Sequence, residues 1–131
     1  MQDKPNTTGE FMNGLDLSKK IAGYLDNKKA KDVRIIKIDD LTVVTDYIVI
    51  ATGTSTTQVK SLADEVDFMV EKELEIKPAR VEGYESKNWI LLDYETVIVH
   101  VFHPQAREYY DLDKLWADGT EIEFELETEE E

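Results

Sequence analysis

The order of strands and helices in this protein is decided by residues 46–76, which read DYIVIATGTSTTQVKSLADEVDFMVEKELEI. The segment DYIVIATG is almost wholly apolar, which predicts a strand buried on both faces. A helix capped by Thr54 or Ser55 is predicted to follow and to end near Pro78. A long helix between two strands implies a right-handed crossover to a parallel neighbouring strand. The helix has one apolar stripe, formed by Val59, Leu62, Ala63, Val66, Val70 and Leu74.

One helix and one strand are predicted before this segment. Leu17, Ile21 and Leu25 recur at helical spacing, and Asp16 is the candidate N-cap of their helix. The short β-branched stretch VRIIKID, which starts at Val33, predicts a strand.

Three strands and one helix are predicted after it. The strands are ARVEGY, NWILLDY and TVIVHVFH, and their short connections predict antiparallel hairpins. The segment PQAREYYDLDKLW, residues 104–116, returns to helical spacing, with Pro104 in the first turn. The predicted order is therefore α-β-β-α-β-β-β-α. This order indicates an α/β fold in which helices pack on a mixed parallel and antiparallel sheet of about five strands.

The composition is that of one globular domain with an acidic surface. The chain has 131 residues, 41% of them hydrophobic, and no cysteine, so disulfides and thiolate metal sites are excluded. No apolar run is long enough to span a membrane and no secretory signal is visible, so we expect a cytoplasmic protein. The net charge of −14 argues against direct binding to DNA and favours a basic protein partner.

The two ends differ in composition from the middle of the chain. Residues 1–14 lack periodicity and are expected to form a mobile N-terminal extension, which leaves 15–117 as the domain. Residues 118–131 contain eight acidic and no basic residues. Because Ile122, Phe124 and Leu126 alternate with glutamates, this end is expected to be either an acidic tail or an extra edge strand.

The two histidines, His100 and His103, are the first candidates for chemistry. They lie three residues apart in a predicted strand, so their side chains should project to opposite faces and should not bind one metal ion. We therefore expect His100 to be a packed or rim residue and His103 to mark the strand end. No catalytic, cofactor-binding or metal-binding residue is assigned.

Two further patterns allow a nucleotide-related reading. The turn ATGTSTTQV places Gly53 and hydroxyl side chains before a helix, which allows phosphate binding but matches no known phosphate-binding motif. A tight turn and an N-cap are the favoured interpretation. Asp93 and Glu95 are paired acids that could hold Mg²⁺ for nucleotidyl transfer, although a hairpin turn explains them more simply. A metal-dependent nucleotidyltransferase, or a nucleotide-binding protein, is therefore the alternative function.

The strand NWILLDY is apolar on both faces. Alternation sends Trp89, Leu91 and Asp93 to one face and Ile90, Leu92 and Tyr94 to the other. Because only three helices are predicted to cover the sheet, part of one face is expected to stay open, with Trp89 exposed on it. An exposed aromatic patch of this kind commonly marks a protein interface. Burial of Trp89 beneath a helix is the other reading.

Separated blocks of the chain resemble the ribosomal silencing factor family, also called the Iojap family. The blocks are TDYIVIATGTSTTQV and RVEGYESKNWILLDYETVIVHVFHPQAREYYDLDKLW, and they agree with the family in order and spacing over about residues 15–116. The acidic end GTEIEFELETEEE is expected to lie outside this region.

The resemblance implies a fold related to nucleotidyltransferases, without an established catalytic site. It also implies binding to the large ribosomal subunit through its fourteenth ribosomal protein. This binding hinders joining of the small subunit and represses translation when nutrients are scarce. By resemblance, the partner-binding residues are Trp89, Leu91, Asp93 and Tyr94. The family self-associates when free, which implies a homodimer, and the expected mechanism needs no enzyme activity and no cofactor.

Overall fold

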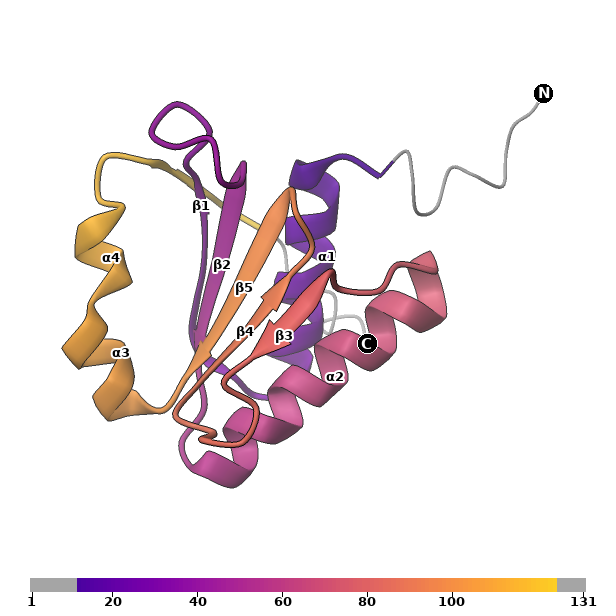
Figure 1. The fold of residues 1–131 in the computed structure, drawn as a ribbon, viewed down its shortest axis with the longest axis vertical. Coiled ribbons are helices and arrows are strands. Elements are labelled where there is room, and N and C mark those ends of the chain that lie inside the picture. The colour runs from indigo at the N-terminus through magenta and orange to yellow at the C-terminus, as the bar shows by residue number, and fades with distance from the viewer. Residues whose placement is uncertain (1–11, 125–131) are drawn as a thin grey trace.

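The computed structural model describes residues 12–124, which form a mixed sheet with helices against both of its faces (Figure 1). Helices α1 (Gly14–Asn27) and α2 (Thr56–Leu74) cover one face. Helices α3 (Pro104–Tyr110) and α4 (Leu112–Leu115) lie on the other. The α/β fold with a mixed sheet is confirmed. The strands are β1 (Lys31–Lys37), β2 (Tyr47–Thr52), β3 (Arg80–Glu82), β4 (Trp89–Asp93), β5 (Val97–Phe102) and β6 (Thr120–Ile122).

The strand order across the sheet is β3-β4-β5-β2-β1-β6. β2 and β5 are parallel, whereas all other neighbouring strands of this sheet are antiparallel. The crossover through α2 is predicted to reach a direct neighbour of β2, but it reaches β3 at the edge of the sheet. Two hairpins then bring β5 back beside β2. The parallel neighbour therefore exists but is a different strand, because β5 is buried along its whole length and needs the central position.

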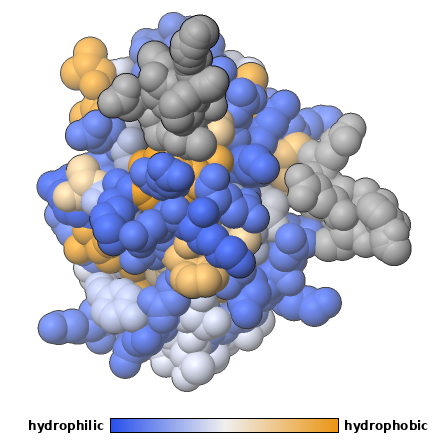
Figure 2. Space-filling view, turned by 90° about the vertical axis from the view of Figure 1, so that its right-hand side faces the viewer, coloured by the Kyte–Doolittle hydropathy of each residue, from blue (hydrophilic) through white to orange (hydrophobic). Residues whose placement is uncertain are grey.

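The larger core lies between the sheet and the two longer helices. The predicted stripe of α2 is buried in full, and its most exposed member, Leu74, has an exposure of 6%. Ile21 and Leu25 of α1 face the same core and are completely buried. Each such side chain stabilises the fold by about 1.5–3 kcal/mol relative to an exposed position. The outward surface of this helical layer is predominantly hydrophilic, with hydrophobic side chains only in small patches (Figure 2).

The N-caps of these helices differ in how well the sequence predicts them. Ser55 caps α2 as expected, because its side-chain oxygen accepts the backbone N–H of Gln58 at 3.1 Å. The predicted cap of α1, Asp16, is wrong. Asn13 is the cap, and its Oδ1 accepts the backbone N–H of Asp16 at 2.8 Å. Asp16 lies in the first turn instead, where its negative charge interacts favourably with the positive end of the helix dipole.

The smaller core lies under α3 and α4. Residues 104–116 are predicted as one helix, but the structure divides them at Asp111, whose φ of 50° is left-handed. The Asp111 carboxylate accepts the backbone N–H of Lys114 at 3.2 Å and starts a new turn. This change of direction allows Leu112 to reach the sheet. The core comprises Ile36, Ile38, Ile48, Ile50, Ile98, Phe102 and Leu112.

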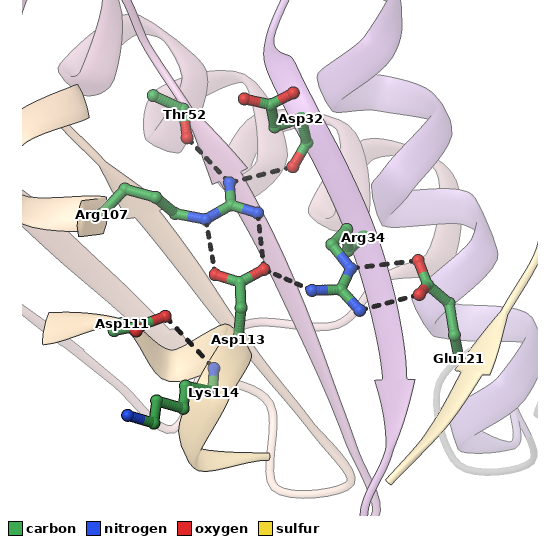
Figure 3. A network of polar contacts seen from close by, with 8 residues as sticks. All are labelled: Asp32, Arg34, Thr52, Arg107, Asp111, Asp113, Lys114 and Glu121. Atoms are coloured by element: carbon green, nitrogen blue, oxygen red, sulfur yellow. Dashed lines mark hydrogen bonds and ion pairs between the residues drawn. The ribbon is translucent and has the colours of Figure 1, made fainter. Parts of the chain in front are cut away.

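Hydrogen bonds from Arg107 connect α3 to α4 and to the sheet (Figure 3). Its Nε and Nη2 donate to the two carboxylate oxygens of Asp113 at 2.9 and 3.0 Å. Its Nη1 donates to Thr52 Oγ1 at 2.8 Å and to the backbone oxygen of Asp32 at 2.9 Å. Hydrogen bonds from Arg107 and Arg34 lower the pKa of Asp113 to about 2, so its carboxylate is ionised at neutral pH.

Arg34 of β1 continues this network to the edge strand β6. It donates to Asp113 and, from Nε and Nη2, to the carboxylate of Glu121 at 3.1 and 2.7 Å (Figure 3). β6 pairs with β1 in an antiparallel ladder in which Ile122 lies opposite Ile35. Gly119 precedes β6, and a Cβ at this position would lie 2.6 Å from Ile36 Cγ2. A larger residue would therefore force β6 away from β1.

The two ends of the chain lie partly outside the described residues. Of the extension expected at 1–14, residues 1–11 are not described, and Gly14 is already the first residue of α1. Of the acidic end at 118–131, residues 120–122 form the edge strand β6 and residues 125–131 are not described. Among residues 12–124, no helix has the length and apolarity needed to cross a bilayer.

The hydrogen bonds of Arg107 should contribute strongly to the stability with which α3 and α4 pack on the sheet. Arg107→Met leaves Thr52, the Asp32 carbonyl and one side of Asp113 without this donor, and the Arg107 side chain is only 13% exposed. We expect a loss of about 2–3 kcal/mol in the free energy of unfolding, measured by urea denaturation. Lys77→Met is the control because the Lys77–Glu71 ion pair is exposed, and it should cost less than about 0.5 kcal/mol. Equal losses of unfolding free energy in the two variants would contradict the stabilising role of Arg107.

Candidate functional site

The candidate site is the part of the sheet around β4 that α3 and α4 leave half open. Trp89, Leu91 and Asp93 project to the α3 side, and all three are half-buried. Ile90 and Leu92 project to the α2 side, with exposures of 0% and 1%. The predicted alternation along this strand is therefore confirmed. One face of β4 belongs to the main core, and the other combines packing with access to solvent.

Trp89 is half-buried. The structure therefore lies between the two predictions, exposure on an open face and burial beneath a helix. Its ring stacks on Phe102 of β5 at a centroid distance of 5.0 Å. Tyr110 of α3 lies against it at 4.5 Å, with the two ring planes at 45°. Phe102 is completely buried, whereas Tyr110 is 49% exposed. The three rings thus connect the smaller core to the molecular surface.

His100 lies beneath Trp89 and accepts a hydrogen bond from it. The indole Nε1 donates to His100 Nδ1 at 3.0 Å, and His100 is 7% exposed. Burial lowers the pKa of this imidazole to about 4, because the charged form would lose its hydration. His100 is therefore neutral at pH 7 and remains a hydrogen-bond acceptor. This agrees with the expectation of a packed histidine.

Charged groups border the other end of the site. The Asp93 carboxylate lies 3.3 Å from Arg80 Nε and accepts the backbone N–H of Glu95 at 2.8 Å. Arg80 also contacts Glu82 at 3.2 Å. Asp93 thus has two structural partners, one across the β3–β4 pair and one in the turn that follows β4. The same contacts explain why an acid at this position suits a hairpin.

Tyr94 does not share this surface with the other three predicted residues. It projects toward α2, is 6% exposed and belongs to the larger core. Burial raises the pKa of its phenol, and the hydroxyl has no hydrogen-bond partner among the described residues. Its prediction as a partner-binding residue conflicts with this burial, because alternation places it on the covered face of the strand. Only Trp89, Leu91 and Asp93 are kept for the site.

The second histidine has a local role. His103 is the N-cap of α3, and its Nδ1 accepts the backbone N–H of Gln105 at 3.4 Å. It follows the end of β5, as expected. Within residues 12–124, no group of three or more histidine, aspartate or glutamate side chains is placed to hold a metal ion.

The turn that contains Gly53 uses its polar groups internally. The backbone N–H of Thr54 donates to Gln58 Oε1 at 2.6 Å, and the N–H of Gly53 donates to the Phe102 oxygen at 2.8 Å. A Cβ at Gly53 would lie 2.9 Å from the backbone nitrogen of Val59, so the glycine permits close packing of strand and helix. Of the two readings of this turn, the geometry favours the cap over the phosphate site.

Tyr110, which contacts Trp89, and its neighbour Tyr109 are absent from the site predicted from the sequence. Tyr109 is 80% exposed and packs edge-on against Tyr110 at 4.9 Å. A hollow of about 400 Å³ lies here, lined by Asn88, His103, Gln105, Ala106, Tyr109 and Tyr110. The available signal was the spacing of Ala106 and Tyr110, which places both on one side of a helix.

Comparison with known proteins identifies the family. The model of the family described as "Ribosomal silencing factor during starvation" matches residues 13–131. The chain belongs to this family. The match reaches further than residues 15–116, so the acidic end lies inside the family's region, contrary to expectation.

Similar proteins and structures support the assignment. Ribosomal silencing factors of Halalkalibacterium halodurans and Bacillus subtilis are 36% and 37% identical to this chain, covering 87% and 82% of it and 97% and 91% of their own lengths. A crystal structure of a Chromobacterium violaceum protein, 34% identical, has a TM-score of 0.77 and covers 91% of this chain and 98% of its own. The mouse protein named "Mitochondrial assembly of ribosomal large subunit protein 1" is 30% identical over 73% of this chain and 43% of itself.

Stability should depend on pH through His100. In the unfolded chain its pKa is ordinary, about 6.5, whereas in the folded protein it is about 4. Between these values the unfolded chain binds more protons, so this stabilisation is complete above about pH 6.5 and is lost as the pH falls toward 4. The full loss corresponds to roughly 3 kcal/mol.

This component can be isolated with His100→Asn, which does not titrate. Urea unfolding of both proteins at pH 7 and pH 4.5 should show a larger loss for the unmodified protein. The titration of the many carboxylates affects both proteins alike. The same loss of unfolding free energy between pH 7 and pH 4.5 in both proteins would show that His100 does not cause this pH dependence.

Proposed function

We propose that this family member binds the large ribosomal subunit through its fourteenth ribosomal protein and sterically blocks joining of the small subunit. Translation is thereby repressed under nutrient limitation, in the cytoplasm. Membership of the ribosomal silencing factor family supports the ribosome-associated role. We choose the face around Trp89, Leu91 and Asp93 as the docking surface because these three side chains are only half-buried.

The name of one relative supports the choice of the large subunit. The mouse protein similar to this chain is named for assembly of the mitochondrial large ribosomal subunit. The bacterial relatives are named ribosomal silencing factors. A protein that occupies the surface of the large subunit facing the small subunit accounts for a silencing action.

The form of the β4 surface suits protein recognition. It offers one large aromatic side chain, one aliphatic side chain and a carboxylate on a single strand, supported from below by completely buried residues. Binding energy in protein interfaces is concentrated in such aromatic residues, with polar groups at the rim. A rigid strand also presents them with little loss of conformational entropy.

The charge of the protein suits a partner in a ribosome. The chain carries 29 acidic and 15 basic residues. Surfaces next to ribosomal RNA are rich in basic residues, so attraction accelerates and orients the encounter with a ribosomal protein. The same charge disfavours contact with the RNA backbone itself.

The proposed mechanism requires no catalytic step. The Asp93 carboxylate is already paired with Arg80 and accepts the backbone N–H of Glu95, so it has a role in the turn that does not involve Mg²⁺. The polar groups of the Gly53 turn are likewise used within the fold. The geometry therefore favours a docking protein over the nucleotidyltransferase alternative.

Trp89→Ala should weaken binding to purified large subunits about 30-fold or more, which corresponds to about 2 kcal/mol. Because Trp89 also packs on Phe102, we expect a further loss of about 1–3 kcal/mol in folding stability. Binding should be measured by co-sedimentation with large subunits at a temperature where the variant is folded, with subunit joining followed by light scattering.

Phe68→Ala is the matched control. Phe68 is an aromatic residue on α2 with an exposure of 60%, on the opposite side of the sheet. This variant should bind and inhibit joining like the unmodified protein. Normal subunit joining in the presence of excess unmodified protein would refute the proposed function.

A further inference from the structure

The indole N–H of Trp89 is used inside the protein, because it donates to the buried Nδ1 of His100 at 3.0 Å. We propose that His100 is a positioning residue that holds the Trp89 ring in its docking orientation, so that the ribosomal partner contacts the ring through carbon atoms and not through the N–H. This inference rests on the proposed function, since it assigns a task to a residue beneath the docking surface. It predicts an apolar recess on the partner at this point.

The Trp89 ring is held from three directions. Phe102 stacks on it with the ring planes at 30°, and Tyr110 lies against it at a centroid distance of 4.5 Å. These contacts limit tilting of the ring, but stacking alone does not distinguish one ring orientation from the orientation flipped about the Cβ–Cγ bond. The hydrogen bond to His100 is directional and removes this freedom. Of the three contacts, only this one defines which edge of the indole faces the partner.

His100 is itself rigid. Its ring lies nearly parallel to Phe102, with planes at 12° and centroids 6.1 Å apart, and it is 7% exposed. It lies on the central strand β5, opposite Leu91 of β4 and Ile50 of β2. An anchor in the middle of the sheet moves less than one on a loop, so the orientation of Trp89 is determined by the core.

The anchor also keeps its acceptor character over the neutral pH range. The titratable and charged groups on this side of the sheet include Asp93 on β4, Arg80 and Glu82 on β3, and Tyr110 on α3. They also include the network of Arg107 on α3, Asp113 on α4 and Arg34 on β1. Burial is the cause of the lowered pKa of His100, about 4, so these groups do not keep it charged. Protonation at lower pH would place two N–H donors against each other and release the indole.

A pair of substitutions of nearly equal shape tests the role. Asn and Leu both branch at Cγ, but only His100→Asn offers an acceptor near the position of Nδ1. The indole N–H signal of Trp89 in a ¹⁵N-correlated NMR spectrum, distinguished from that of Trp116 with Trp116→Phe, reports the hydrogen bond directly. Binding to purified large subunits reports the consequence for docking.

We expect His100→Asn to keep slow exchange of the indole N–H and to bind within about threefold of the unmodified protein. His100→Leu should show fast exchange of the indole N–H, a native backbone spectrum and about tenfold weaker binding, because the ring is no longer oriented before docking. In a Trp89→Phe background, His100→Leu should have no further effect on binding, since there is no N–H to position. His100→Leu with unaltered affinity, or equal losses in both backgrounds, would overturn the inference.

The unmodified protein provides a second test, with His100→Leu as the comparison. Its Trp89 indole N–H signal should shift with a midpoint near pH 4 as His100 becomes protonated, within the range where the backbone spectrum is native. The same pH-dependent shift in His100→Leu would overturn the role of His100. Failure of the proposed function would look different, because the unmodified protein would then leave subunit joining normal, whatever the NMR signal of Trp89 shows.

Discussion

The burial of β5 along its entire length is the constraint on which the rest of the structure depends. A strand with all six residues buried must lie inside the sheet and must be covered on both faces. The longer helices α1 and α2 provide one cover. The other comes from the short α3 and α4, held over the sheet by Arg107, Arg34 and Asp113. This second cover extends over β5, β2 and β1 and leaves β4 half open, which is how one fold produces both a core and an exposed apolar strand.

Much of the fold could be predicted from periodicity. The apolar stripe of α2, the alternation along β4 and the hairpins between β3, β4 and β5 follow local rules, because side-chain spacing and short connections determine them. The identity of the strand beside β2 could not be predicted from periodicity. It depends on which strand is buried most completely when it occupies the centre of the sheet. The cap at Asn13 and the break at Asp111 also escaped prediction. Each depends on a single side chain bonding to a particular backbone group.

The candidate site was predictable in part, and for identifiable reasons. Strand alternation was enough to place Trp89, Leu91 and Asp93 together, and it separates Tyr94 from them equally clearly. The role of Tyr94 came from resemblance, which carries residue identities but not the face on which each residue lies. The contact of Tyr110 with Trp89 was missed because it joins α3 to β4, two elements separated in sequence. Such contacts appear only when the packing of α3 on β5 is known.

Under the proposed function, half-burial of Trp89 affects how binding energy would be distributed over this surface. A fully exposed tryptophan would bury more apolar area on docking, but its ring would also lose more rotational freedom. Here much of the ring is already in contact with Phe102, Tyr110 and His100, so less area remains to be gained and little entropy to be lost. In the proposed docking, Leu91 would add apolar contact beside Trp89. The partner would then complete the cover of β4 that α3 and α4 leave incomplete, in the position that a further helix would occupy.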